Sequence, residues 1–187
     1  MRSVATLLIV MTFLASCASD TSLPLDVYAE QVSAAAAAYV EESQSISLKY
    51  QGDVERKVAE LAASDAPDAV EEAFGVVREE TVRYLAQLDD TIGRFHDALS
   101  GLEPPRDLAV PHRGYVDVVG TVRDTLPALG LAVDGATSIE GIGQVLAESG
   151  FADGQAVWVA ACSTLEQGIR DLGRGADLKC IRNDVAS

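Results

Sequence analysis

The strongest constraint on the fold is a hydrophobic repeat of three and four residues that runs from about Pro67 to Leu102. This spacing places apolar side chains on one face of an α-helix and predicts a helix of about 35 residues, roughly 50 Å long. Asp65-Ala66-Pro67 is typical of a helix start, and Gly101 followed by Pro104-Pro105 is typical of a helix end. The predicted apolar seam consists of Val70, Phe74, Val77, Thr81, Tyr84, Leu88, Ile92 or Thr91, Phe95, Leu99 and Leu102.

A similar repeat precedes this one, from Leu25 to about Ala63. Its apolar positions recur at intervals of three, four and seven residues, and the alanines at 34–38 favour helix through their intrinsic propensity. Gly52 is the expected weak point, where this helix kinks or breaks. Two long amphipathic helices in succession predict an antiparallel hairpin. The predicted inward residues are Tyr28, Val32, Ala35, Tyr39, Ile46, Tyr50, Val54, Val58 and Leu61.

The rest of the chain carries the signals of three shorter helices. Pro111 begins the first, and Pro127 is expected to kink or end it. Thr137-Ser138-Ile139-Glu140 has the spacing of a capping box that opens the second, which Gly150 closes. The third runs from about Asp153 to Leu172. The predicted inward residues are Tyr115, Val119, Val122, Leu126 and Leu129, then Trp158, Ala161, Leu165, Ile169 and Leu172.

Together these elements predict an all-α fold. We expect a helical bundle built from the long antiparallel hairpin plus the shorter C-terminal helices, with residues 25–187 as a single domain. No run of residues shows the convincing period-two alternation of a strand. Trp158 and the five tyrosines fit core or seam positions of the predicted helices better than a ligand cage.

The N-terminal segment has the features of a secretory signal. Arg2 precedes an apolar run from Val4 to Leu14, about eleven residues and therefore shorter than the roughly 20 that a membrane span needs. The run ends in Leu14-Ala15-Ser16-Cys17, which resembles the lipobox of bacterial lipoproteins. The alternative is an ordinary secreted protein with a chance cysteine at this position.

The lipobox resemblance implies a lipid anchor. Leu14, Ala15 and Ser16 would form the signal-peptidase recognition site, the Cys17 thiol would take a diacylglycerol, and cleavage would remove residues 1–16. Residues 17–24 would then be the lipidated cysteine and a short tether that ends at Pro24. This predicts a protein held at the extracytoplasmic face of the cell membrane, or at the outer membrane if the organism has two, because Ala18 stands where an aspartate would signal inner-membrane retention.

The charge of the chain restricts its partners. The formal net charge is −15, which disfavours nucleic acid and close contact with an anionic bilayer surface, since both are polyanions. The expected partners are therefore the membrane, reached through the lipid anchor, and other proteins of the envelope.

Cys162 and Cys180 are the two cysteines left beyond Cys17. Outside the cytoplasm cysteines are oxidised, and the residues after Leu172 are numerous enough to fold back to Cys162, so we expect a disulfide. The alternative is a pair of buried free thiols. The stretch from Ala161-Cys162 to Asp177-Leu178-Lys179-Cys180 also resembles the tails of uncharacterised, actinobacterial-type helical lipoproteins, a resemblance that carries no known activity.

The sequence lacks a recognisable catalytic or metal-binding motif. His96 and His112, the two histidines, have no second ligand at metal-binding spacing and are expected on polar helix faces, so neither a metal nor another cofactor is expected. The acidic pairs, including Glu79-Glu80, are expected on solvated faces. Two acid–base pairs four residues apart are expected to form there, Glu79 with Arg83 and Asp90 with Arg94.

These features favour a non-enzymatic protein of the cell envelope. The first hypothesis is an interaction or scaffold module, because long amphipathic helices occur without any chemical motif. The alternative is a module that binds a small ligand between the hairpin and the C-terminal helices. An enzyme is the third and weakest hypothesis, because no nucleophile motif, phosphate loop or dinucleotide fingerprint is present.

Overall fold

The computed structural model describes residues 22–64 and 67–180, which form five α-helices and one 3-10 turn and contain no strand. This confirms the predicted all-α helical bundle. The elements in chain order are α1 (Leu25–Ala62), α2 (Ala69–Ser100), η1 (Arg106–Leu108), α3 (Ala109–Asp134), α4 (Ile139–Glu148) and α5 (Phe151–Asp171).

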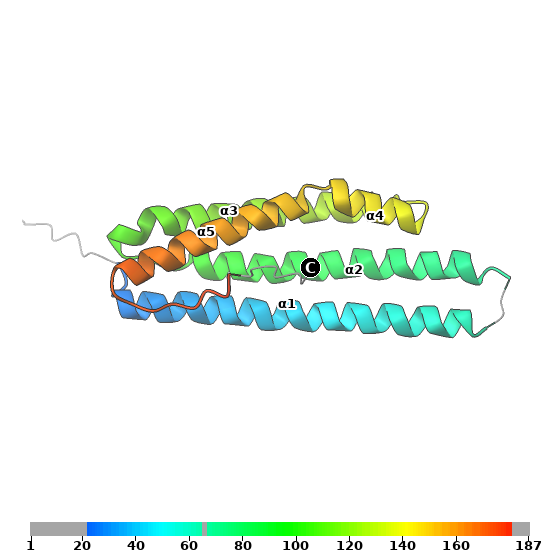
Figure 1. Cartoon of the computed structure of the whole chain (residues 1–187), viewed down its shortest axis with the longest axis horizontal. Helices are drawn as coiled ribbons and strands as arrows, with labels where there is room; N and C mark the ends of the chain where they lie inside the picture. The colour runs from blue at the N-terminus through cyan, green and yellow to red at the C-terminus, as the bar shows by residue number, and fades with distance from the viewer. Residues whose placement is uncertain (1–21, 65–66, 181–187) are drawn as a thin grey trace, which may run out of the picture.

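The helices form two layers. Helices α1 and α2 make the predicted antiparallel hairpin, and α3 and α5 lie on one side of it, with the short α4 between them in the chain (Figure 1). The main helix contacts are α1 with α2, α2 with α3, and α3 with α5. The hairpin is the longer layer and extends beyond the end of α4 (Figure 1).

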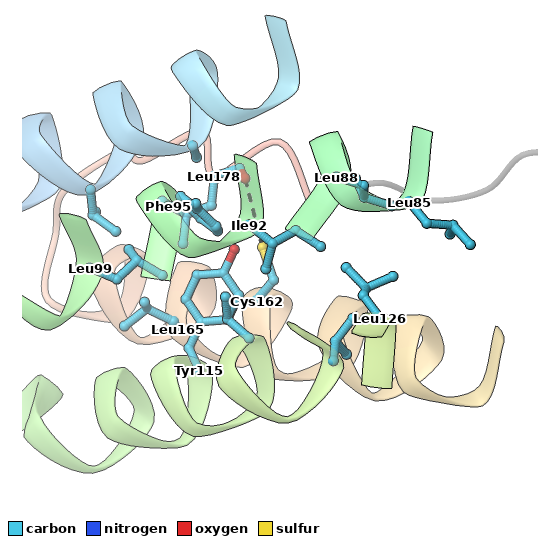
Figure 2. Close-up of a cluster of buried hydrophobic side chains, with 14 of the residues drawn as sticks. Leu85, Leu88, Ile92, Phe95, Leu99, Tyr115, Leu126, Cys162, Leu165 and Leu178 are labelled. Atoms are coloured by element: carbon cyan, nitrogen blue, oxygen red, sulfur yellow. Dashed lines mark hydrogen bonds between the residues drawn. The ribbon is translucent and has the colours of Figure 1, made fainter. Parts of the chain in front are cut away.

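The buried residues of the hydrophobic core lie in the second layer and in the part of the hairpin that this layer covers. We call this part, together with the layer that covers it, the proximal half: residues 22–40 of the first helix of the hairpin and residues 84–180. The remaining hairpin, residues 41–83, is the distal half. The buried residues of α1 are Tyr28, Ala29, Val32 and Ala36, all proximal. Figure 2 shows the matching side chains of the other helices meeting in this core, among them Phe95, Leu99, Tyr115, Leu126 and Leu165.

Two predicted interruptions do not occur. Helix α1 continues through Gly52, and α3 continues through Pro127 to Asp134. Gly52 is exposed, and the hydrogen bond of 2.9 Å between the hydroxyls of Tyr50 and Thr81 fixes α1 to α2 beside it. Pro127 also faces solvent, while its neighbour Leu126 is buried, so packing of the inner face offsets the hydrogen bond that a proline removes.

The starts of α4 and α5 also differ from the prediction by one or two residues. Ser138, not Thr137, is the N-cap of α4, and its hydroxyl accepts a hydrogen bond of 3.0 Å from the Gly141 N–H. Helix α5 begins at Phe151, directly after Gly150, whose φ of 69° lies in the left-handed region that glycine tolerates best. The predicted Asp65 cap of α2 lies outside the described residues.

The predicted inward residues are buried or partly buried near the core. At the start of α2 and at the end of α5, one predicted inward residue is exposed. Val70 is 86 % exposed, because the start of α2 lies in the distal half, where no second layer covers it. Leu172 is 40 % exposed, because α5 has already ended at Asp171. Leu85, which was not part of the predicted seam, is buried.

The C-terminal tail returns along the bundle. The N–H groups of Gly173 and Arg174 bond the carbonyls of Arg170 and Ile169, which is the Schellman arrangement that ends a helix with a reversal. The tail then passes α1, where the Asp177 N–H donates to Ser33 Oγ at 3.3 Å.

The predicted disulfide joins this tail to α5. The Cys162 and Cys180 sulfurs are 2.04 Å apart. The dashed line in Figure 2 runs from Cys162 Sγ to the Leu178 carbonyl oxygen, 3.8 Å away, and is a packing contact because a disulfide sulfur has no proton to donate. Leu178 is buried, so the tail contributes a side chain to the core in addition to its disulfide with α5.

Candidate binding cleft

An apolar cleft lies at the boundary between the proximal and distal halves. It encloses about 1400 Å³, counting the open space at its mouth. Both hairpin helices form one side of it, and the end of α3 with α4 and the start of α5 forms the other. The hairpin side consists of Tyr39, Ser43, Gln44, Ser47, Leu48, Tyr84, Leu85 and Leu88. The facing side consists of Leu129, Leu146, Phe151, Ala152 and Gln155.

None of the thirteen residues that line the cleft carries a charge. This is unusual for a chain in which 23 % of the residues are charged and the net charge is −15. The polar groups of the lining are hydroxyls and side-chain amides, which bond neutral donors and acceptors equally well. The cleft is therefore suited to an uncharged, largely apolar ligand.

A more enclosed pocket continues from the cleft toward the core. Its cavity volume is about 80 Å³, or about 540 Å³ when the open solvent beside it is counted, and it shares Tyr39, Phe151 and Gln155 with the cleft. Its own lining residues are Ile92, Val122, Trp158, Val159 and Lys179. The two cavities together form one path that leads from the solvent at Leu48 inward to Trp158.

Aromatic rings form a wall of the inner pocket. The Tyr39 ring stacks on Phe95 and Trp158, with centroids 4.8 and 5.4 Å apart, and Tyr115 meets Phe95 and Trp158 edge-on. Burial raises the pKa of Tyr39 to about 12, so this hydroxyl remains protonated at neutral pH. Stacked rings of this kind have few accessible rotamers and give the pocket a rigid apolar surface.

Hydroxyl pairs hold the hairpin side of the cleft together. Ser47 Oγ lies 3.2 Å from the Tyr84 hydroxyl, directly at the lining. One turn further along the hairpin, the Tyr50 and Thr81 hydroxyls are 2.9 Å apart, and Thr81 also donates to the Val77 carbonyl at 2.7 Å. The two helices are thus fixed to each other by polar contacts at the point where the apolar core ends.

Comparison with protein-family models, curated proteins and solved structures gave no match. A proposal about its function therefore rests on the geometry of the chain. Among the described residues, no helix is both long enough and apolar enough to cross a bilayer.

The predicted anchor and disulfide residues fall in different parts of the chain. Leu14, Ala15, Ser16 and Cys17 lie outside the described residues. Cys180 follows Lys179, which lines the inner pocket, so the disulfide fixes one edge of that pocket. Within residues 22–64 and 67–180, no three His, Cys, Asp or Glu side chains are grouped closely enough to hold a metal ion.

His112 is buried, contrary to the prediction of a polar helix-face position. It is 6 % exposed, and its Nδ1 lies 2.9 Å from the hydroxyl of the fully buried Tyr28. Burial lowers the pKa of His112, and a hydrogen bond to the Leu99 backbone partly opposes this. The neutral imidazole that accepts from Tyr28 at Nδ1 and donates to the Leu99 carbonyl satisfies all three groups. His112 is therefore a structural residue at the proximal end.

Glu80 is also buried, contrary to the prediction that the acidic pairs are solvated. It is 3 % exposed. Its carboxylate accepts from Lys57 Nζ at 2.5 Å and from Arg83 Nη1 at 2.6 Å. The hydrogen bond from Lys57 lowers the pKa of Glu80, with Arg83 acting in the same direction.

Of the two acid–base pairs predicted from their spacing of four residues, one forms and the other is replaced. The predicted pair of Glu79 with Arg83 forms at 2.6 Å. Arg94 bonds Glu42 across the hairpin instead of the predicted Asp90. Neither the buried acid nor the cross-hairpin pair touches the cleft, so these ions brace the hairpin.

Sequence analysis did not identify the cleft, although a signal for it exists. Residues 43–48 of α1 form an uncharged run between Glu42 and Lys49, and residues 84–88 of α2 form another between Arg83 and Asp89. The rest of these helices alternates charged and apolar positions. Two facing uncharged runs therefore indicate a surface that can bind another molecule. Their juxtaposition depends on the hairpin register, which the sequence pattern did not establish.

Proposed function

We propose that this chain is a lipid-anchored, non-enzymatic binding module of the bacterial cell envelope, and that it holds an apolar ligand in the cleft. The observation that carries the proposal is the uncharged, apolar lining of that cleft in a strongly acidic protein. Small-molecule sites are typically concave and mostly apolar, with a few polar groups that orient the ligand. This favours the ligand-binding alternative from the sequence over a purely structural scaffold.

The entry of the chain into the bundle is compatible with an anchor at the proximal end. The Leu23 N–H donates to the Glu103 carbonyl at 2.9 Å, which holds the segment before α1 against the end of α2. A tether from Cys17 would leave from this end. Helix α1 has 38 residues and is therefore about 57 Å long, so the hairpin tip would point away from the anchored end.

The cleft would then be held away from the membrane surface. Its lining residues on α1 run from Tyr39 to Leu48, which is roughly 20–35 Å along the helix from Leu25. Such a position would give envelope components access to the cleft from the side.

The non-enzymatic part of the proposal rests on the chemistry of the lining. General acid–base catalysis needs a group that exchanges protons near neutral pH, and nucleophilic catalysis needs an activated side chain. The cleft offers serines, glutamines and tyrosines, without a histidine, cysteine or carboxylate among its lining residues. An arrangement of this kind is suited to binding.

A scaffold role is the second candidate, and the distal half is the observation in its favour. Leu48 is 69 % exposed and Val70 is 86 % exposed on a two-helix projection. A protein partner that packs on the distal hairpin would cover exposed apolar side chains of this kind.

Site-specific photo-cross-linking in the native envelope tests the proposal. A benzoylphenylalanine at Gln155, inside the cleft, should give an adduct that the same residue at the exposed Ala156, outside both cavities, does not give. A benzoylphenylalanine at Val70 reports on the scaffold alternative. Adducts from Val70 alone would favour the scaffold, and identical patterns from Gln155 and Ala156 would sink the binding role of the cleft.

The anchor is tested separately. Cys17→Ser should abolish labelling by a palmitate analogue and either leave the precursor uncleaved or release the protein from the membrane fraction. Normal labelling and processing of the Cys17→Ser protein would refute the lipid anchor without bearing on the cleft.

A further inference from the structure

We infer that the ligand is an uncharged single-chain amphiphile, whose hydrocarbon chain lies along the apolar cleft with its end at the inner pocket, and whose neutral polar head lies at the mouth of the cleft. This inference rests on the proposed binding role of the cleft and specifies its ligand. Three features of the two cavities lead to it: the narrowing from the cleft to the inner pocket, the mainly apolar lining of that pocket, and the charge of the lining.

The path narrows inward from an open cleft to a smaller pocket. The cavity volume is about 630 Å³ for the outer cleft and about 80 Å³ for the inner pocket, and the two meet at Tyr39, Phe151 and Gln155. A flat apolar surface would be matched by a partner helix that covers it. An inward extension lined by Ile92 and Val122 gains from a flexible chain that enters it, because each buried methylene adds to the affinity.

The inner pocket provides few partners for a peptide backbone. Each peptide unit that enters brings an N–H and a C=O group, and leaving these unpaired away from water is costly. The wall is mainly aromatic rings and branched aliphatic side chains, and its polar side-chain groups are the Gln155 amide, the Tyr39 hydroxyl, the Trp158 indole N–H and the Lys179 ammonium. A hydrocarbon chain has no such requirement, so the pocket favours an alkyl chain over a polypeptide segment.

The charges argue for a neutral head group. The outer lining has no charged residue, so an ionic head there would lose hydration without gaining a partner. Lys179 is the one charged residue at the inner pocket, and its ammonium already bonds the Asp177 carboxylate. The chain as a whole is acidic, which further disfavours an anion.

The polar groups of the mouth suit hydroxyls or amides in the head. Ser43 and Ser47 lie one turn apart on α1, with Gln44 between them. Ser43 Oγ donates to the Val40 carbonyl and Ser47 Oγ pairs with the Tyr84 hydroxyl, and each serine oxygen keeps a free lone pair. The mouth can therefore accept hydrogen bonds from a polyol head such as glycerol.

A matched set of amphiphiles tests the inference on the purified domain. Monolaurin, laurate and lauroylcholine share one acyl chain and differ in head charge, and each is used below its critical micelle concentration to displace the apolar fluorophore N-phenyl-1-naphthylamine. Monolaurin should displace it best. In a series of monoacylglycerols, affinity should rise about fourfold per added methylene until the inner pocket is full, and then level off.

Two variants show whether the amphiphile is in the cleft. Ala152→Trp should lower monolaurin affinity at least tenfold by filling the cleft, whereas Ala156→Trp on the same helix lines neither cavity and should leave it unchanged. Gln155 is exposed enough to change without loss of folding, and Gln155→Lys should shift preference from monolaurin toward laurate by about two- to fivefold. The Ala156→Lys protein controls for added surface charge.

The outcomes separate this inference from the broader binding role. Equal affinity for the three head groups, or no gain with chain length, would overturn the inference. If cross-linking from Gln155 still captured an envelope protein in that case, the binding role would stand with a different ligand. Failure of the fluorophore to bind, together with no cleft-specific cross-link, would overturn both.

Discussion

The proximal and distal halves of this molecule are built from the same two helices, yet they are stabilised differently. In the proximal half, Tyr28 and Val32 of α1 are fully buried against α2 and the second layer. After Ala36, none of the described residues of α1 is fully buried. The distal half relies on the hydroxyl pairs near Tyr50 and on the ion cluster of Glu80.

The difference shows that an amphipathic repeat specifies which face of a helix is apolar, but not how completely that face is buried. A seam between two helices stays open to water along both edges, so its apolar residues are only half covered. A third and fourth helix must close those edges before burial becomes complete. The cleft lies where the second layer stops. Its apolar lining is the end of the core, which the second layer covers incompletely.

The largest expected effect contrasts one leucine from each half. Leu99 is fully buried in the proximal core, and Leu61 is half-buried near the hairpin tip. Leu99→Ala should lower the free energy of unfolding by about 4 kcal/mol, because it removes buried methylenes and leaves a cavity. Leu61→Ala should cost about 1 kcal/mol, because water already reaches the site. Urea denaturation followed by circular dichroism measures both.

The comparison would fail if the two substitutions cost the same. A large cost for Leu61→Ala would mean that a partner or a second copy of the chain covers the hairpin tip in solution. Sedimentation of the purified domain would distinguish these causes.

The sequence predicted the fold well where local signals dominate. The hairpin, the five helices and most of the seam follow from apolar spacing and from Gly and Pro signals. The largest failures share one cause, namely tertiary contact. Pro127 stays within α3 because its inner neighbours are buried, and Val70 is exposed because the second layer of the described residues does not reach it.

The candidate site was predicted much less well, for the same physical reason. The Cys162–Cys180 pair was predictable, because the cysteine count and chain reach restrict the alternatives. The cleft was not, because it depends on which parts of the hairpin the shorter helices leave uncovered. His112 and Glu80 were expected in solvent, and each is buried by a partner far away in sequence: Tyr28 for one and Lys57 for the other.

The second prediction concerns the disulfide, which belongs wholly to the proximal half. Cys162 and Cys180 are 18 positions apart, so opening the bridge should lower the free energy of unfolding by about 3 kcal/mol or less in the chain-entropy description. The tail after Gly173 should fray, because its buried Leu178 loses the covalent tie to α5. Hydrogen exchange on oxidised and reduced protein measures the change by segment.

The distal half provides the internal control for this experiment. Amides of residues 41–62 should keep their relative protection on reduction, since the hairpin contacts involve neither cysteine. Peptide mapping without reductant should find one linked peptide pair. Two freely alkylated thiols in protein from the envelope would refute the bridge.

The third prediction concerns the buried pair of Tyr28 and His112, at the end of the proximal half remote from the hairpin tip. Tyr28→Phe should cost about 1 kcal/mol, the usual value of one hydrogen bond, because the ring still fills its site. Added salt or a lower temperature should change this free-energy cost little, because both partners are neutral. The free energy of unfolding at pH 7.5 is the measurement.

The same pair should make the fold sensitive to mild acid. The folded-state pKa of His112 is lowered by burial, so below the ordinary value of 6.5 the unfolded chain binds a proton that the folded chain resists. Stability should therefore fall as pH drops below about 6.5, and it should not fall on raising the pH from 6.5 to 7.5. His112→Gln should flatten this slope between pH 7 and 5.5, whereas the matched variant His96→Gln should keep it. An unchanged slope in His112→Gln would show that the burial of this imidazole is not what couples the proximal half to pH.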